Sequence, residues 1–241
     1  MLTIVITMAG LGSRFRKAGY AVPKYQIEAH GKTLFDWSMI SLDGYKSITD
    51  NYIFIVRKED DAHDFIAARC KVLDIPKYTV VELDHLTDGQ ATTAMLAAPY
   101  WNKDNELLIY NIDTYVEKGQ MNAEELRGDG FIPCFSGVGD HWSFVRLGEN
   151  EKAAEVREKL RISDHCTLGA YYFKSCALYE NLYNEYYSSN ENLEKGEKYV
   201  APLYNYLISK GGLVYISDVM PQTVHVLGTP EELDDFLKET I

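Results

Sequence analysis

The residues at the start of this chain combine a flexible backbone with fixed positive charge. An apolar run at positions 4–9 leads into Gly10-Leu11-Gly12-Ser13-Arg14, and Pro23-Lys24 follows about ten residues later. Glycines let the backbone approach a ligand closely and expose its N–H groups. The Arg14 guanidinium presents a fork of donors that suits phosphate oxygens, and Lys24 adds a point charge. These residue types, in this order, predict a site for a nucleoside triphosphate.

Two further segments carry polar side chains at positions where a ligand could meet them. The apolar run 106–110 is followed by Asn111-Ile112-Asp113, and in open α/β sheets ligands bind at the carboxyl ends of the strands. Asp113 could therefore hold Mg2+ through its carboxylate oxygens, or it could cap the next turn. Asp88-Gly89-Gln90 opens a predicted helix, where Gln90 could contact a base or Asp88 could be an ordinary helix cap.

Several other functions are disfavoured by the same sequence. A dinucleotide fingerprint requires a third glycine at position 15, which is Phe15, and no Gly-x4-Gly-Lys-Ser/Thr pattern of a P-loop occurs. The net charge of −12 argues against nucleic acid as a partner, because a duplex binder needs a cationic surface. The six histidines and four scattered cysteines show no metal-ligand spacing.

The composition predicts one cytoplasmic domain. A chain of 241 residues with 46% apolar content can bury one sizeable core, so we expect a single domain over residues 1–241. Scattered cysteines are typical of free thiols in a reducing compartment. The sequence has neither a signal-peptide profile nor 18 consecutive apolar residues, so we expect no membrane partner. An oligomer is compatible with the sequence.

Short apolar runs alternate with helical segments along the chain. This alternation favours a single Rossmann-like α/β domain with a central mixed, mostly parallel sheet flanked by helices. The predicted strands are 2–7, 52–56, 78–82, 106–110, 130–135, 142–146, 167–173, 213–216 and 223–226. The predicted helices are 34–42, 61–73, 90–98, 176–188, 200–209 and a last one after Thr229, with a capping box to Glu232. The polar stretch 188–198 is predicted to be a surface loop.

Taken together, these segments resemble the sugar-phosphate nucleotidyltransferase family. Its signature, Gly-x-Gly-x-Arg and then Pro-Lys, matches residues 10–14 and 23–24, and its next turn matches Gly31-Lys32-Thr33. Gly89-Gln90-Ala91 resembles the base-recognition segment, and Asn111-Ile112-Asp113 resembles the strand end that carries a metal aspartate.

The resemblance continues through the second half of the chain. Glu158-Lys159 and Gly169 resemble the acceptor-phosphate element and the glycine strand behind it, and residues 228–231 match the closing Gly-Thr-Pro-Glu turn. The matches run from residue 4 to residue 232, which is nearly the whole chain.

One position departs from the family pattern. Most members have a second metal aspartate two residues before the closing glycine, where this chain has Val226. Either one carboxylate holds the metal, or a neighbour such as Asp218 or His225 compensates. Strand alternation places His225 on the face opposite Val226, which argues against His225.

The resemblance implies transfer of NMP from a pyrimidine NTP, with CTP favoured, to a phosphorylated small acceptor, with release of pyrophosphate and with Mg2+ as cofactor. The loop Phe15-x-x-Ala18-Gly19-Tyr20 and the Val226 change resemble the capsule-biosynthesis branch of the family. The acceptor would then be a sugar 1-phosphate or a non-sugar phosphate such as phosphoglutamine. The implied catalytic residues are Arg14, Lys24, Asp113 and Lys159, and Asp113 is also the implied metal ligand. The implied nucleotide-binding residues are Met8, Ala9, Gly10, Gly12, Ser13, Arg14, Lys24, Gly89, Gln90, Asn111 and Asp113. The implied acceptor-binding residues are Lys159 and Gly169.

Two other functions stay open at this point. A glycosyltransferase with a nucleotide-sugar donor would share the strand-end carboxylate, but Asp113-Thr114-Tyr115 lacks the second acid of an Asp-x-Asp clamp. A non-catalytic nucleotide-binding regulator would account for the missing carboxylate at Val226.

Overall fold

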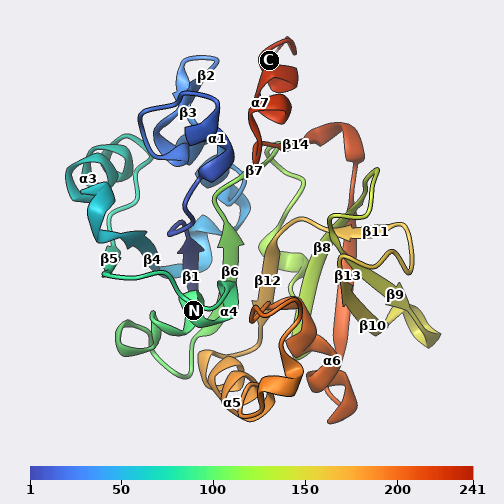
Figure 1. Cartoon of the computed structure of the whole chain (residues 1–241). Coiled ribbons are helices and arrows are strands. Elements are labelled where there is room, and N and C mark those ends of the chain that lie inside the picture. Colours follow the sequence, from blue (N-terminus) through green and yellow to red (C-terminus); the bar gives the residue numbers. More distant parts are fainter. Residues whose placement is uncertain (241) are drawn as a thin grey trace.

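Four parallel strands form the first half of the central sheet in the computed structural model, which describes residues 1–240 (Figure 1). β1 (Leu2–Thr7) lies between β4 (Thr49–Arg57) and β6 (Glu106–Asn111), and β5 (Tyr78–Leu83) pairs with β4 at the edge. Apolar residues dominate these strands because both faces of a parallel sheet are covered by other elements. The carboxyl ends of β1, β4 and β6 consequently meet at one edge of the sheet.

The second half of the sheet is mainly antiparallel. β12 (Ala170–Phe173) pairs antiparallel with both β6 and β8 (Gly130–Ser136), and so joins the two halves. The remaining strands of this half are β9 (Ser143–Leu147), β10 (Ala153–Glu158), β11 (His165–Thr167) and β13 (Val214–Val219), of which β13 runs parallel to β8. The mixed, largely parallel sheet predicted from the sequence is thereby confirmed.

Helices cover both faces of the sheet. One hydrophobic cluster includes Phe35 of α2 and Ile66 of α3, and the other includes Ala91 of α4, Tyr179 of α5 and Tyr204 of α6. The helices are α1 (Ser13–Lys17), α2 (Leu34–Ile40), α3 (His63–Val72), α4 (Gln90–Met95), α5 (Cys176–Tyr186), α6 (Ala201–Ser209) and α7 (Pro230–Phe236). Within residues 1–240, none of the helices has the length and hydrophobicity that a bilayer crossing requires.

A short ribbon brings the carboxyl-terminal segment beside the end of β6. β14 (Val224–Val226) pairs antiparallel with β7 (Thr114–Val116), and Leu227 N donates a hydrogen bond to Asp113 O at 2.8 Å. A third small hydrophobic cluster holds α7 here, through Phe236 against Trp37. A two-stranded hairpin of β2 (Glu28–Ala29) and β3 (Lys32–Thr33) lies between α1 and α2 in the chain.

The observed elements differ from the predicted ones in several places. The strand predicted over 167–173 is divided into β11 and β12, because Gly169 has a φ of +74° that interrupts an extended strand. β10 was not predicted, because Ala153–Glu158 lacks the strict alternation of apolar and polar residues that marks a half-buried strand, and only Ala153 and Val156 in it are buried. The short helix α1 was not predicted from the sequence.

Candidate functional site

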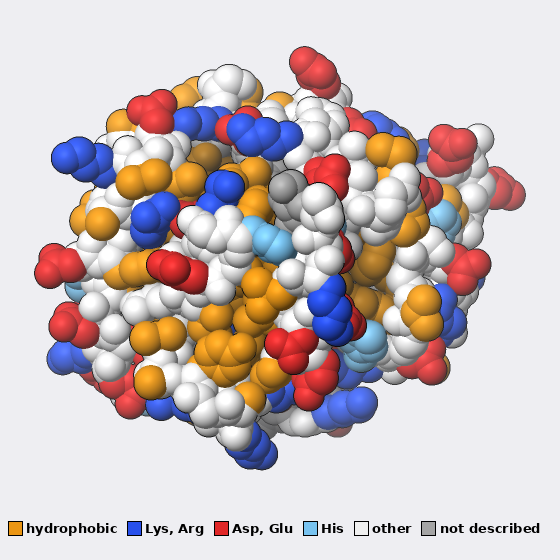
Figure 2. Space-filling view, turned by 90° about the horizontal axis from the view of Figure 1, so that it is seen from above, with side chains coloured by type: hydrophobic (Ala, Val, Ile, Leu, Met, Phe, Trp, Pro, Cys, Tyr) orange, Lys and Arg blue, Asp and Glu red, His pale blue; other side chains and the backbone are white. Residues whose placement is uncertain are grey.

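A cavity of about 430 Å3 opens at the carboxyl ends of the parallel strands. Thr7 of β1, Arg57 of β4 and Asn111 of β6 line it. The predicted site residues that also line it are Met8, Ala9, Gly10, Gly12, Lys24, Gly89, Gln90, Asn111 and Asp113. Figure 2 looks down on the end of the molecule toward which β1 and β6 point in Figure 1, and it shows hydrophobic side chains with charges of both signs around them.

The loop after β1 presents bare backbone to the cavity. A Cβ atom added at Gly10 would meet no atom within 4 Å, so the space beside this residue is open to a ligand. Gly12 has a left-handed φ of 59° immediately before α1, a conformation that glycine adopts without steric cost. Ser13 and Arg14 begin α1, are exposed, and lie outside the residues that line the cavity.

Lys24 and Asp113 form an ion pair in the cavity. Lys24 Nζ lies 2.8 Å from Asp113 Oδ2, and the two side chains are 18% and 33% exposed. Burial alone would raise the pKa of the Asp113 carboxyl, but the charge and hydrogen bond of Lys24, with the charge of Arg14, hold that pKa below its ordinary value. Asp113 is therefore ionised at neutral pH, and the Arg14 charge is near enough to act on it.

An amide network forms the inner wall of the cavity. Gln90 Nε2 donates hydrogen bonds to Thr7 Oγ1, at 3.3 Å, and to Asn111 Oδ1. Because these bonds use both amide hydrogens, Gln90 Oε1 is the atom through which this side chain can accept a hydrogen bond from a ligand. Gly169 lies directly behind Asn111, since a Cβ atom at Gly169 would fall 2.4 Å from Asn111 Nδ2. Gly169 thus leaves room for the Asn111 amide.

Gly89 joins the start of α4 to the segment before α6. Its φ is +140°, and a Cβ atom added there would fall 2.3 Å from Lys198 O. Lys198 N donates to Asp88 O at 2.8 Å, and Ala91 N donates to Lys198 O at 3.0 Å. These contacts bring Tyr199 to the wall of the cavity. The carboxyl-terminal end of the predicted surface loop at 188–198 therefore lies at the site.

Lys159 contacts the wall of the cavity through Tyr199. It follows β10, and its Nζ donates a hydrogen bond to Tyr199 OH at 2.9 Å and lies 3.5 Å from Glu158 Oε1. Tyr199 lines the cavity and Lys159 does not. Burial would lower the pKa of the Lys159 ammonium, but the hydrogen bond to Tyr199 and the charge of Glu158 outweigh burial and raise that pKa. Lys159 is therefore a fixed positive charge beside the cavity.

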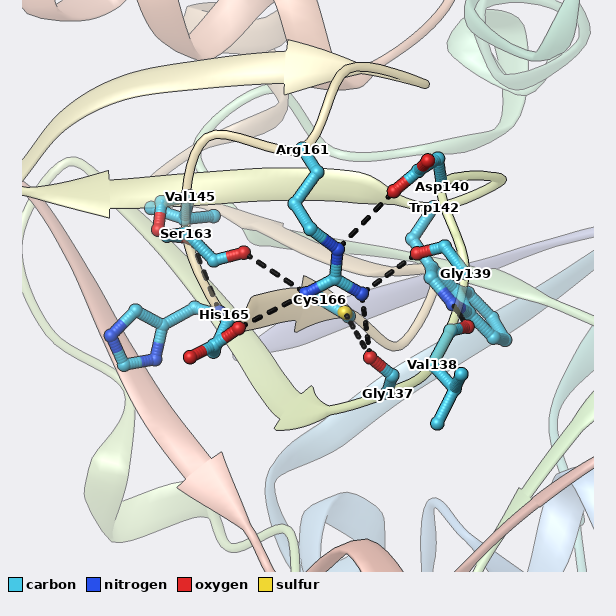
Figure 3. Close-up of polar contacts among 11 residues, drawn as sticks. Gly137, Val138, Gly139, Asp140, Trp142, Val145, Arg161, Ser163, His165 and Cys166 are labelled. Atoms are coloured by element: carbon cyan, nitrogen blue, oxygen red, sulfur yellow. Dashed lines mark hydrogen bonds and ion pairs between the residues drawn. The ribbon is translucent and has the colours of Figure 1, made fainter.

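Arg161 joins the loop that carries Lys159 to the loop between β8 and β9. Its guanidinium donates hydrogen bonds to the carbonyl oxygens of Gly137 and Gly139, each at 2.7 Å, and to two nearby aspartates (Figure 3). Lys159 N donates to Trp142 O at 2.8 Å, which links the same two loops through the backbone. The loop after β10 is thereby fixed against the loop between β8 and β9.

A buried charged group in the cavity wall was not predicted from the sequence. Arg57 Nη2 lies 2.5 Å from Asp60 Oδ1, and these side chains are only 6% and 3% exposed. Tyr25 OH donates to Asp60 Oδ2 at 3.3 Å, and Arg16 Nη2 lies 3.9 Å from Asp60 Oδ1. All four residues line the cavity. Arg57 ends β4 beside β1, so the strand-end argument applied to Asp113 could have identified it.

Neither of the two residues considered as a replacement for the missing carboxylate at Val226 lies in the cavity. Asp218 Oδ1 lies 2.8 Å from His165 Nδ1 on the far half of the sheet. His225 Nδ1 lies 2.7 Å from Glu239 Oε2. Neither Asp218 nor His225 lines the cavity. Among residues 1–240, no group of three or more His, Cys, Asp or Glu side chains is arranged to hold a metal.

Asp113 nevertheless fits a magnesium site. Mg2+ in nucleotide sites is commonly held by one or two carboxylates, with phosphate oxygens and water completing its octahedron. The Lys24 ammonium rests on Asp113 Oδ2 at 2.8 Å, which shows that this oxygen faces a position suited to a cation.

Comparisons with known proteins identify relatives among solved structures. No protein-family profile matches the chain, and a search of curated proteins gave no match. The nucleoside-diphosphate-sugar pyrophosphorylase from Vibrio cholerae RC9 is 36% identical, with a TM-score of 0.90 over 99% of this chain and 100% of that chain. The inositol-1-phosphate CTP transferase from T. maritima is 17% identical, with a TM-score of 0.75 over 99% and 97% of the two chains.

A third solved structure has the same fold. It is a Bacillus anthracis protein assigned as a glucose-1-phosphate thymidylyltransferase, in complex with sucrose. It is 15% identical, with a TM-score of 0.80 over 100% of this chain and 97% of that one. At such identities the second and third structures support the fold alone. The Vibrio cholerae structure, more than one third identical over essentially the full length of both chains, supports more than the fold. The chain therefore belongs to the sugar-phosphate nucleotidyltransferase family that includes nucleoside-diphosphate-sugar pyrophosphorylases, and it is a nucleotidyltransferase.

Proposed function

We propose that this nucleotidyltransferase transfers CMP from CTP to a phosphorylated small acceptor, with release of pyrophosphate. The observation that carries the proposal is that one cavity contains the Lys24–Asp113 ion pair, the bare glycine loop and a Gln90 carbonyl free to accept a hydrogen bond. Charged groups suited to a triphosphate and an amide suited to a base edge therefore share one space.

The orientation of Gln90 favours cytosine among the pyrimidines. Thr7 and Asn111 occupy both amide hydrogens of Gln90, so Gln90 Oε1 can only accept. Cytosine carries an amino group at position 4, which donates, whereas uracil and thymine carry a carbonyl oxygen there, which accepts. A carbonyl of the protein facing a carbonyl of the base would leave both without a hydrogen, at a cost of about 1–3 kcal/mol.

The charged residues would act by positioning and by charge neutralisation. Backbone N–H groups of Gly10, Gly12 and Ser13 would hold the triphosphate. Arg14 would stabilise the departing pyrophosphate. The Lys24 ammonium would move away from Asp113 and would neutralise negative charge at the α-phosphate. Mg2+ held by Asp113 would polarise the α-phosphate oxygens.

The acceptor would react through an oxygen of its own phosphate. That oxygen forms a new bond to the α-phosphorus while the bond from the α-phosphorus to the oxygen bridging to the β-phosphate breaks, and this bridging oxygen leaves with pyrophosphate. An acceptor phosphate is already ionised at neutral pH, so the step needs no general base. Lys159 would bind the incoming phosphate, with Tyr199 between it and the cavity.

For the acceptor, we propose a sugar 1-phosphate or a non-sugar phosphate such as phosphoglutamine, in the synthesis of a surface-polysaccharide precursor. The support is the resemblance of the loop around Phe15 and of the Val226 position to the capsule-biosynthesis branch. Glu197 and Tyr199 line the part of the cavity nearest Lys159, and they offer a carboxylate and a hydroxyl to a polar acceptor.

The test is pyrophosphate release across a panel of nucleotides and acceptors. CTP, UTP, dTTP, ATP and GTP are each incubated with Mg2+ and with sugar 1-phosphates or phosphoglutamine. We expect release with CTP at least about tenfold faster than with UTP or dTTP. Gln90→Leu should remove this preference, and Gln222→Leu, at an exposed position outside the cavity, should keep it. A preference for UTP or dTTP would refute the cytosine assignment, and no release from any combination would refute the transfer reaction.

A further inference from the structure

Gly228 separates two carboxylates that come from distant parts of the chain. A Cβ atom added at Gly228 would lie 3.4 Å from Asp113 Oδ2 and 3.4 Å from Glu232 Oε2. The two carboxylate oxygens are therefore at most twice that distance apart, and the side-chain volume between them is empty. Asp113 follows β6 and lines the cavity, whereas Gly228 and Glu232, in the first turn of α7, lie beside Asp113 and outside the cavity lining.

Glu232 does not make the full capping box predicted for α7. Glu232 N donates to Thr229 Oγ1 at 3.2 Å, as the predicted cap requires. In a capping box the glutamate would accept a hydrogen bond from the backbone N–H of the cap residue, Thr229. Glu232 Oε2 instead accepts from Gly228 N, at 3.0 Å. The carboxylate thus reaches one residue farther than helix capping needs, toward Asp113.

The Lys24 ammonium occupies a cation position on one of these two carboxylates, Asp113. It rests on Asp113 Oδ2, the same oxygen that lies nearest Gly228. We infer that Glu232 is the second carboxylate of a divalent-cation site formed with Asp113 across Gly228, and that the Lys24 ammonium stands in for the ion in the unliganded protein. The inference rests on the proposed function for its biological ion, Mg2+ with a nucleoside triphosphate.

This arrangement gives the site the two acidic groups that Val226 cannot supply. The span between the two carboxylates suits an ion bound directly by Asp113 and reached by Glu232 through one of its waters, since Mg2+ keeps several waters in nucleotide sites. The absence of a side chain at Gly228 keeps this space open. Glu232 then fixes the ion and also caps the backbone N–H of Gly228.

Metal binding without nucleotide tests this inference separately from the transfer reaction. Mn2+ alone is titrated into the full-length protein, and free Mn2+ is measured by electron paramagnetic resonance. Lys24→Met should uncover the site and tighten Mn2+ binding at least about tenfold over wild type, because the competing ammonium is gone. In that background Glu232→Gln should weaken binding roughly 10- to 100-fold, as loss of an outer carboxylate does elsewhere. Glu231→Gln, at the exposed neighbouring position, should leave binding unchanged.

A rescue variant distinguishes a lost carboxylate from a disturbed fold. Glutamine keeps an oxygen that can accept from Gly228 N, so the start of α7 should survive, and thermal unfolding checks this. Adding Val226→Asp to the Lys24→Met, Glu232→Gln protein should restore Mn2+ binding. Equal Mn2+ affinity with and without Glu232→Gln would overturn the inference, as would no tightening in Lys24→Met. Either result would leave the pyrophosphate-release test, and therefore the proposed function, to stand or fall by itself.

Discussion

Replacing Gly89 with alanine should lower the free energy of unfolding by about 2–6 kcal/mol. The φ of +140° and ψ of 173° at Gly89 lie in a region that is essentially restricted to glycine, and forcing another residue into it costs about 1–3 kcal/mol. The new Cβ atom would also fall 2.3 Å from Lys198 O and 2.6 Å from Lys198 N. Relieving such crowding adds about 1–3 kcal/mol. The neighbouring backbone cannot move freely, because Lys198 is hydrogen-bonded to Asp88 and Ala91.

Two other glycines separate strain from crowding. Gly211 has a φ of +85° but no atom within 4 Å of an added Cβ, so Gly211→Ala should show strain alone, about 1–2 kcal/mol. Gly10 has neither a left-handed φ nor a close neighbour, so Gly10→Ala should change stability by less than about 0.5 kcal/mol. Its methyl group would instead occupy the space proposed for the triphosphate, and nucleotide binding should weaken.

Urea unfolding followed by circular dichroism measures all three variants under one set of conditions. The expected order of stability loss is Gly89→Ala, then Gly211→Ala, then Gly10→Ala. Isothermal titration with CTP and Mg2+ then shows whether Gly10→Ala is impaired in binding although it is stable. If Gly89→Ala proves no less stable than Gly211→Ala, the close approach of Lys198 carries no energetic weight and the reasoning fails.

Three further predictions follow from the charges of the cavity. Asp113→Asn and Arg14→Ala should each lower pyrophosphate release by about 100-fold or more while the protein stays folded, and wild-type rates in both would remove the proposed site. The folded-state pKa of Asp113 is lowered, so its stabilising contribution is present above the ordinary carboxyl pKa of about 4 and is lost as the pH falls below it. The difference in unfolding free energy between wild type and Asp113→Asn should accordingly shrink between about pH 5 and pH 3 in urea titrations. Arg57→Met should cost about 3 kcal/mol by the same method, because it leaves the buried Asp60 without its main partner, whereas Lys58→Met, at an exposed position, should be nearly neutral.

Local patterns were sufficient to predict which residues gather at the carboxyl ends of the parallel strands. A glycine loop after a buried strand and a polar residue at a strand end are short-range signals, and parallel strands bring their carboxyl ends together at one edge. Gly10, Lys24 and Asp113 consequently line one cavity, as expected from their places in the sequence. The same reasoning, applied to β4, would have added Arg57.

The rest of the site depends on contacts between distant backbone segments. Nothing near Lys198 in the sequence indicates that its carbonyl packs on Gly89, and the polar composition around it is typical of a solvent-exposed loop. Likewise, position 169 has no room for a side chain because the Asn111 amide, which belongs to a different strand, lies against it. Such positions require glycine for lack of space, and a single sequence does not reveal where space is lacking.

The buried and half-buried charges that line the unliganded cavity are already paired with one another. Lys24 pairs with Asp113, and Arg57 pairs with Asp60, so neither aspartate is left as an unpaired charge in the empty site. An unpaired buried charge would be costly. A triphosphate can recruit the Lys24 ammonium only if another cation takes its place on Asp113, because two anionic groups would otherwise meet at a partly buried position. Nucleotide and divalent ion should therefore bind together. The Lys24–Asp113 ion pair should disfavour the binding of nucleotide without metal. Under the inference drawn above, Asp113 and Glu232 would hold the ion, and a carboxylate at position 226 would not be needed.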